Sequence, residues 1–82
     1  MMEGLEPKIL AKVQQVLADA LNVDPTEVTS ELAFGDLVQW DSMGHMDVMM
    51  SLEQEFGIQV DADTITELVS VPVICQYIQQ QG

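Results

Sequence analysis

Three stretches of the sequence repeat apolar residues at every third or fourth position, and this spacing places them along one side of a helix. The first stretch is 5–21, with a proline in its first turn, where a missing amide is harmless. The second opens at Asp41-Ser42, two residue types that cap helices, and closes at Phe56-Gly57, where glycine is the usual terminator. The third begins at the Val-Pro pair of 71–72 and ends near residue 80. The sequence therefore predicts three long helices.

The connecting segments predict one short helix and no sheet. The acidic opening of 61–65 is typical of a helix N-terminus, and 24–27 could form a single helical turn. Residues 58–60 alternate like a strand, but three residues without a partner do not make a sheet. The connection 22–40 is long for so small a domain, so we expect its apolar side chains to pin it to the core. These are Val23, Val28, Leu32, Phe34, Leu37 and Val38.

We therefore expect an all-α fold: a small four-helix bundle of three long helices and one short third helix, with a long loop between helices one and two. The 82 residues suffice for a single domain, 1–82, with about 5–80 folded and 81–82 as a frayed tail. The glutamine-rich end of the chain, 79–82, is typical of a terminus that frays. The acidic N-terminus does not resemble a secretory signal, and no apolar run could span a membrane. The single cysteine, Cys75, lies in an apolar stripe and cannot form an internal disulfide, so we expect a buried thiol and a cytoplasmic setting.

Charge narrows the choice of partners. Fourteen carboxylates face two lysines, Lys8 and Lys12, so the formal net charge is −12. Nucleic acids and anionic membranes are poor partners for such a chain, because binding them requires lysine and arginine. A protein with a basic patch would be attracted instead. Like charge also favours a monomer.

The start of the second helix and the acidic residues each raise one possible kind of chemistry. Ser42 and His45 are three positions apart and share a helix face. A serine nucleophile and its histidine base could be arranged in this way. A hydrolase also needs an oxyanion site and a pocket, which a bundle of this size scarcely supplies. A calcium loop starting at Asp61 fails because Ile65, Thr66 and Pro72 occupy positions that need ligands or glycine. We expect no catalytic residue and no metal site.

A resemblance to a known family rests on Asp41-Ser42-Met43, which is similar to the D-S-[LM] attachment motif of acyl carrier proteins. Residues 21–29 resemble the end of that family's first helix, 52–58 the end of its second, and 71–78 its fourth. The resemblance covers nearly the whole chain.

This resemblance implies a free-standing carrier. A phosphopantetheinyl transferase would move 4′-phosphopantetheine from coenzyme A onto the Ser42 hydroxyl, within the motif that begins at Asp41. The arm's thiol would hold an acyl or aminoacyl group as a thioester and present it to acyl-loading and acyl-processing enzymes. The chain itself would catalyse nothing. The alternative is an unmodified acidic helical module that only binds other proteins.

The family's second helix implies two faces. On the inner face lie Val48, Met49, Leu52 and Phe56, where an acyl chain could also insert between the helices. The residues expected to face partner enzymes are Met43, Met46, Asp47, Met50 and Gln54. Flexible thioether side chains suit a surface that meets several partners.

Several features depart from the common pattern of fatty-acid carriers. The order Phe34-Gly35-Asp36-Leu37 shifts the acidic-leucine pair by one place. Trp40 stands where a small residue is frequent, and either packs on the bundle or flanks the arm. Gly44 costs roughly 1 kcal/mol of helix propensity relative to alanine, which indicates close approach by a partner. His45 makes the helix start less acidic. These departures favour a dedicated carrier in polyketide, peptide-type or other specialised metabolism over a housekeeping fatty-acid role.

Overall fold

The structure, a computed structural model, describes residues 6–81. Its elements in chain order are α1 (Pro7–Leu21), the 3₁₀ turn η1 (Pro25–Glu27), α2 (Ser42–Phe56), α3 (Ala62–Glu67) and α4 (Val71–Gln81). The predicted all-α fold with three long helices and a short third one is confirmed. The described residues contain no strand, and 58–60 is irregular as expected.

Local residues set the helix ends. Glu6 caps α1 by accepting a hydrogen bond from the amide of Ile9, and Pro7 follows at the first position. The expected start at residue 5 lies outside the described residues. At the other end Asn22 adopts a left-handed conformation, with φ of 60°, and α2 ends in the same way at Gly57 with φ of 69°. These positive φ angles direct the chain back over the bundle.

The C-terminal helix is longer than the sequence predicted. The helix was expected to end near residue 80, and α4 continues through Gln81, one residue further. The side chain of Gln79 accepts a hydrogen bond from the backbone amide of Glu6 at 2.6 Å, which ties the last turns of α4 to the start of α1. This tertiary contact supports the last turns of α4, whose glutamines bury little surface of their own. Gly82 lies outside the described residues.

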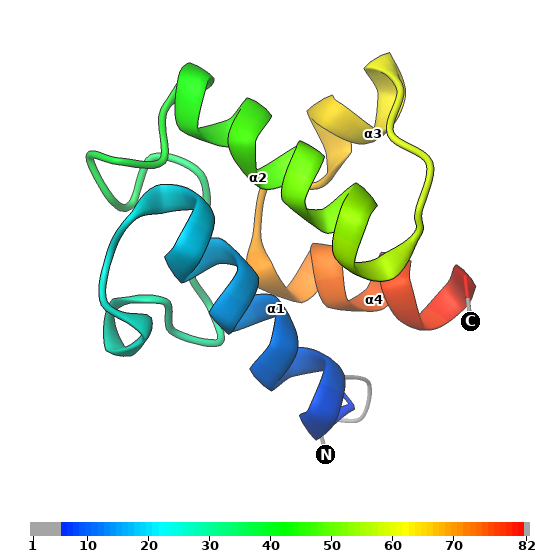
Figure 1. Cartoon of the computed structure of the whole chain (residues 1–82), viewed down its shortest axis with the longest axis horizontal. Helices are drawn as coiled ribbons and strands as arrows, with labels where there is room; N and C mark the ends of the chain where they lie inside the picture. The colour runs from blue at the N-terminus through cyan, green and yellow to red at the C-terminus, as the bar shows by residue number, and fades with distance from the viewer. Residues whose placement is uncertain (1–5, 82) are drawn as a thin grey trace.

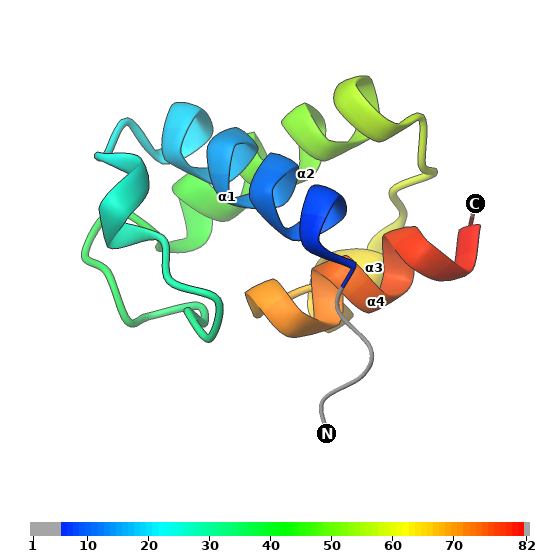
Figure 2. The same cartoon turned by 90° about the horizontal axis from the view of Figure 1, so that it is seen from below.

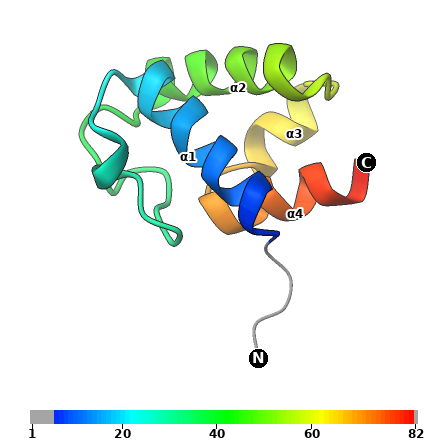
Figure 3. The ribbon, with the colours of Figure 1, turned by 60° about the horizontal axis from the view of Figure 1, so that its bottom comes forward.

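Helix α1 packs against both α2 and α4, while α3 packs against α2 (Figures 1 and 3). Each long helix contributes fully buried side chains to a single core. The largest fully buried side chains of this core are Trp40, Leu17, Met49, Leu52, Leu68 and Ile74, of which Trp40 and Leu68 come from the connecting segments. No helix in residues 6–81 is long and apolar enough to cross a membrane.

The long connection between α1 and α2 gathers at one end of the bundle (Figure 2). Val28 and Leu32 are buried there, as expected, and the Leu32 carbonyl accepts a hydrogen bond from the Val71 amide at 2.8 Å. The expectation was wrong for Val38, which is 90% exposed, because the turn that closes before Trp40 directs the Trp40 side chain inward and leaves Val38 outside. Backbone hydrogen bonds to the start of α4, together with these buried residues, hold the loop in place.

Candidate functional site

The start of α2 is built around Asp41, which is the N-cap of the helix. Its Oδ1 accepts a hydrogen bond from the Gly44 amide at 2.9 Å, and its carbonyl accepts one from the His45 amide at 2.7 Å. Asp41 therefore terminates the loop and fixes the direction in which α2 leaves it. The two predicted cap residues divide their roles: Asp41 is the cap, and Ser42 is the first residue of the helix.

Ser42 is exposed at this helix end. The structure gives its hydroxyl no hydrogen-bond partner within residues 6–81. The cap uses the amide of Gly44, which leaves the amides of Ser42 and Met43 at the positive end of the helix. A phosphodiester on the Ser42 oxygen would therefore meet free backbone donors at this helix end. The first turn carries no acidic side chain, and the Asp41 carboxylate at the cap is engaged with the Gly44 amide. The residues present fit a phosphopantetheine arm.

Trp40, two residues before Ser42, is completely buried. The sequence left open whether this ring packs on the bundle or flanks the arm, and the structure shows that it packs on the bundle. Its Nε1–H donates a hydrogen bond to Nδ1 of His45 at 3.0 Å, which satisfies the indole's single polar group. The loop is thus anchored immediately before the proposed attachment residue.

His45 points into the core, and only 5% of its surface is exposed. An indole N–H can only donate, so Nδ1 must accept; the Ile65 carbonyl, 2.7 Å from Nε2, can only accept, so Nε2 must carry the proton. The imidazole is therefore the neutral Nε2–H tautomer with both nitrogens occupied. It has no free lone pair to act as a base for Ser42, although the two residues are one helical turn apart.

A third ring completes a cluster that sequence reasoning did not find. The Phe34 ring meets the His45 ring edge-on, with centroids 5.3 Å apart, and lies 6.3 Å from the Trp40 ring. We call Phe34, Trp40 and His45 the ring cluster. Phe34 was expected to pin the loop and does so, yet 41% of it is exposed. No periodicity links a loop residue to a helix residue eleven positions later, so only the tertiary structure reveals this contact.

Gly44 has a different role from the one predicted. A Cβ placed on it would collide with the backbone carbonyl oxygen of Gln39 and lie 3.0 Å from Cδ2 of Leu21. The close approach that requires a glycine is made by the chain's own loop, so the expectation of approach by a partner was mistaken about the source. Gly44 lets the loop lie against α2 at the point where Trp40 enters the core.

The two faces predicted for α2 differ in exposure as expected. Val48, Met49 and Leu52 are fully buried. Phe56 is half-buried, and the Lys12 ammonium lies 5.8 Å from the centre of its ring. On the other face Met43, Met46 and Met50 are 79%, 44% and 56% exposed, and Asp47 and Gln54 are exposed too. Their role in binding partners stays a prediction.

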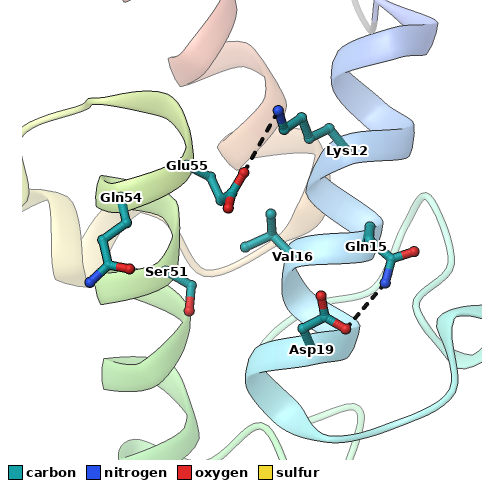
Figure 4. A pocket seen from close by; sticks show the side chains of 7 residues that line it. All are labelled: Lys12, Gln15, Val16, Asp19, Ser51, Gln54 and Glu55. Atoms are coloured by element: carbon teal, nitrogen blue, oxygen red, sulfur yellow. Dashed lines mark hydrogen bonds and ion pairs between the residues drawn. The ribbon is translucent and has the colours of Figure 1, made fainter.

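A shallow groove of about 260 Å³ runs between α1 and α2 (Figure 4). Lys12 and Glu55 face each other across it with a separation of 3.7 Å, and both side chains are about half exposed, so this ion pair contributes little stability. Gln15 donates to Asp19 at 3.2 Å on the α1 side. The full lining is Lys12, Gln15, Val16, Asp19, Ser51, Gln54 and Glu55. Gln54 is the one predicted docking residue that reaches this groove.

Cys75 is buried in α4, and burial raises the pKa of its thiol to about 11. A thiol protonated at neutral pH is a poor nucleophile, so Cys75 is a core residue. No group of three or more His, Cys, Asp or Glu residues within 6–81 is arranged to hold a metal ion.

Comparison with known proteins points to one family. A family model described as "Phosphopantetheine attachment site" matches residues 11–78. The chain is 32% identical to an acyl carrier protein of Thermosynechococcus vestitus over 76 residues, which cover 93% of this chain and 94% of that protein. It is also 32% identical to acyl carrier proteins of Rubrobacter xylanophilus and Thermotoga maritima, over 87% and 90% of this chain and 88% and 91% of theirs.

Proposed function

The chain belongs to the acyl carrier protein family, whose members bear a phosphopantetheine attachment site, and we propose that Ser42 is the residue that receives the arm. The observation that carries this proposal is the exposed Ser42 hydroxyl at the start of α2, directly after the Asp41 cap. When bound, the arm supplies a thiol that holds an acyl group as a thioester. The carrier's task is then to present that group to other enzymes of a biosynthetic pathway.

The chain's own contribution is positioning. Asp41 fixes the start of α2 through the Gly44 amide, and the buried Trp40 holds the preceding loop. Ser42 is therefore held in place from both sides. The helix end places backbone amides and a positive dipole where the phosphodiester forms. Since both nitrogens of His45 are engaged inside the core, we propose that Ser42 is a substrate hydroxyl and not a nucleophile of this protein.

Intact mass spectrometry tests the attachment. The protein is incubated with coenzyme A and a broad-specificity phosphopantetheinyl transferase, and we expect a mass gain equal to one arm. Ser42→Ala should abolish the gain. Ser51→Ala, which changes the other serine of the same helix, should load as well as the wild type. Failure of the wild type to load beside an active control carrier would favour an unmodified acidic binding module instead.

Acyl carrier proteins in general meet phosphopantetheinyl transferases and acyl-processing enzymes. We propose that the outer face of α2 makes these contacts here, through Met43, Met46, Asp47, Met50 and Gln54. Exposed thioethers supply adaptable apolar area, and a carboxylate supplies attraction to a basic patch. The net charge of −12 makes a cationic partner surface the electrostatic match and keeps copies of the chain apart as monomers.

Transferase kinetics test this face. We expect the combined change Met43→Ala, Met46→Ala and Met50→Ala to raise KM several-fold. The matched control is Val69→Ala with Val73→Ala, which removes exposed apolar area elsewhere and should leave KM unchanged. Asp47→Asn should weaken binding at low salt, where Glu31→Gln on the long loop should not. Equal effects in the two sets would contradict the proposal.

We further propose that the chain works in the reducing cytoplasm, consistent with its single buried thiol. A dedicated carrier in polyketide, peptide-type or other specialised metabolism suits the Trp40, Gly44 and His45 departures better than a general fatty-acid role. Isolation of the protein from its source, followed by mass measurement of the bound thioester, tests the pathway. A range of long saturated acyl groups would contradict a specialised role.

A further inference from the structure

The ring cluster lies close to Ser42, at the start of α2. His45 is one turn along α2 from Ser42, Trp40 is two residues before it, and Phe34 covers the edge of the imidazole. Any group that entered the bundle from Ser42 between α2 and α3 would have to pass His45, because its imidazole is bonded to the Ile65 carbonyl of α3.

Hydrogen bonds hold two of the rings in place. Trp40 donates to His45 and His45 donates to Ile65, so one chain of bonds joins the loop, α2 and α3. If α2 and α3 separate here, Nε2–H of His45 and the Ile65 carbonyl lose each other as partners. An alkyl chain offers no donor or acceptor to replace them, and a buried polar group without a partner is costly.

The core behind the cluster is also filled. Val48, Met49 and Leu52, which follow His45 along the inner face of α2, have no exposed surface. Two of the surface hollows formed by the described residues, the groove between α1 and α2 and a hollow beside Phe56 and Gly57, lie elsewhere. The second is at the far end of α2, whose fifteen residues span about 22 Å. Neither hollow is lined by a residue of the ring cluster.

We propose that the ring cluster keeps the cargo outside the bundle, so that this carrier is built for a short or polar acyl group and not for a long alkyl chain. The inference rests on Ser42 being the attachment residue. A long chain gains free energy with every methylene it buries, whereas a short or polar group gains little and can stay in water. A closed core therefore suits an acyl group that gains little from burial and must remain accessible to enzymes.

The chain's single tryptophan is a built-in probe of this idea. Wild-type protein is loaded from acetyl-, hexanoyl- and decanoyl-coenzyme A, and intact mass confirms that each form is complete. We expect the indole Nε1–H resonance and the fluorescence maximum of Trp40 to be the same in all three forms and in the unacylated holo-protein. Hydroxylamine should cleave each thioester as fast as it cleaves the matching free acyl-pantetheine. A chain-length-dependent shift of Trp40, or protection of the decanoyl thioester, would overturn the proposal.

A variant tests the role of the rings themselves. Trp40→Leu with His45→Leu removes both rings and the bond between them. If this protein folds, decanoyl loading should raise its Tm above that of its own holo form, while the wild type shows no rise. A folded variant without a rise would contradict the role of the rings; if the variant does not fold, the wild-type series decides alone. Absence of any mass gain would mean that the attachment at Ser42 fails, which is a different result from a shift in a loaded protein.

Discussion

Trp40 Nε1 lies 3.0 Å from Nδ1 of His45, and this buried hydrogen bond joins the loop before Ser42 to the first turn of α2. His45 in turn reaches the Ile65 carbonyl at 2.7 Å, so the same imidazole joins α2 to α3. One side chain thus connects the three segments that surround the proposed attachment residue. Several measurable consequences follow from its chemistry and from that of its neighbours.

The tautomer of His45 can be measured directly. Because Nδ1 accepts from an indole N–H and Nε2 donates to a carbonyl, we expect the neutral Nε2–H form at pH 7. Nitrogen-15 NMR of the ring should show an unprotonated Nδ1 and a protonated Nε2, with a coupling across the bond from Trp40. A pattern averaged between both tautomers would contradict the arrangement.

A double-mutant cycle measures the strength of the bond. Trp40→Phe leaves the buried Nδ1 of His45 without a donor, which should cost about 1–3 kcal/mol of unfolding free energy. We expect a coupling energy of about 0.5–3 kcal/mol between Trp40→Phe and His45→Leu, since the two residues share one bond. Urea denaturation supplies the four free energies. Met50→Ala, at an exposed position, is the control and should change stability by less than about 0.5 kcal/mol. Additive effects of the two core changes would show that the bond contributes nothing.

Gly44→Ala should destabilise the protein although alanine is the better helix former. The gain in propensity is about 1 kcal/mol, but the new methyl group meets the Gln39 carbonyl, and overpacking of this kind costs about 1–3 kcal/mol. We expect a lower urea midpoint than for the wild type. Ser51→Ala, in the middle of the same helix, should be neutral or slightly stabilising. A Gly44→Ala protein of raised stability would mean that the loop gives way easily.

Cys75 should resist alkylation until the protein unfolds. Burial raises its pKa to about 11 from an ordinary value of 9.0, so the folded state favours the neutral thiol. This contribution to stability is complete below pH 9 and is lost as the pH rises through 11. We expect iodoacetamide to label the native protein at pH 8 far more slowly than the urea-unfolded protein.

The predicted loss of stability at alkaline pH is tested by comparing the wild type with Cys75→Ala. The free energy of unfolding of the wild type should fall more steeply between about pH 9 and 11 than that of the variant, which lacks the titrating thiol. Rapid labelling of the native thiol, or parallel pH profiles for the two proteins, would show that Cys75 is accessible in the folded state.

Much of this molecule follows from local patterns. The apolar spacing of 5–21 and 71–80 and the capping types at Asp41 and Gly57 predicted the long helices, because helix periodicity and end chemistry are properties of neighbouring residues. The acidic opening before α3 predicted the short helix for the same reason. The burial of Met49 and the exposure of Met43 came from matching the family's second helix.

Other features of the fold could not be predicted from local patterns, because they depend on contacts between segments that are distant in the sequence. The last turns of α4 are supported by a contact with Glu6 at the opposite end of the chain, and the exposure of Val38 depends on how one turn enters the core. The need for a glycine at 44 was visible in the sequence, but its cause was not, because the crowding atom belongs to Gln39 in the preceding loop.

The sequence by itself determined the helices, the acidity and the position of the Asp41-Ser42 pair, since each depends on residue type and short-range spacing. Only the tertiary structure decided what surrounds that pair. Ser42 and His45 look like partners along the helix, yet burial turns the imidazole toward Trp40 and Ile65 and leaves the hydroxyl alone at the surface. Hydrogen-bond satisfaction inside a core is settled by packing in three dimensions, and no spacing along the chain specifies it.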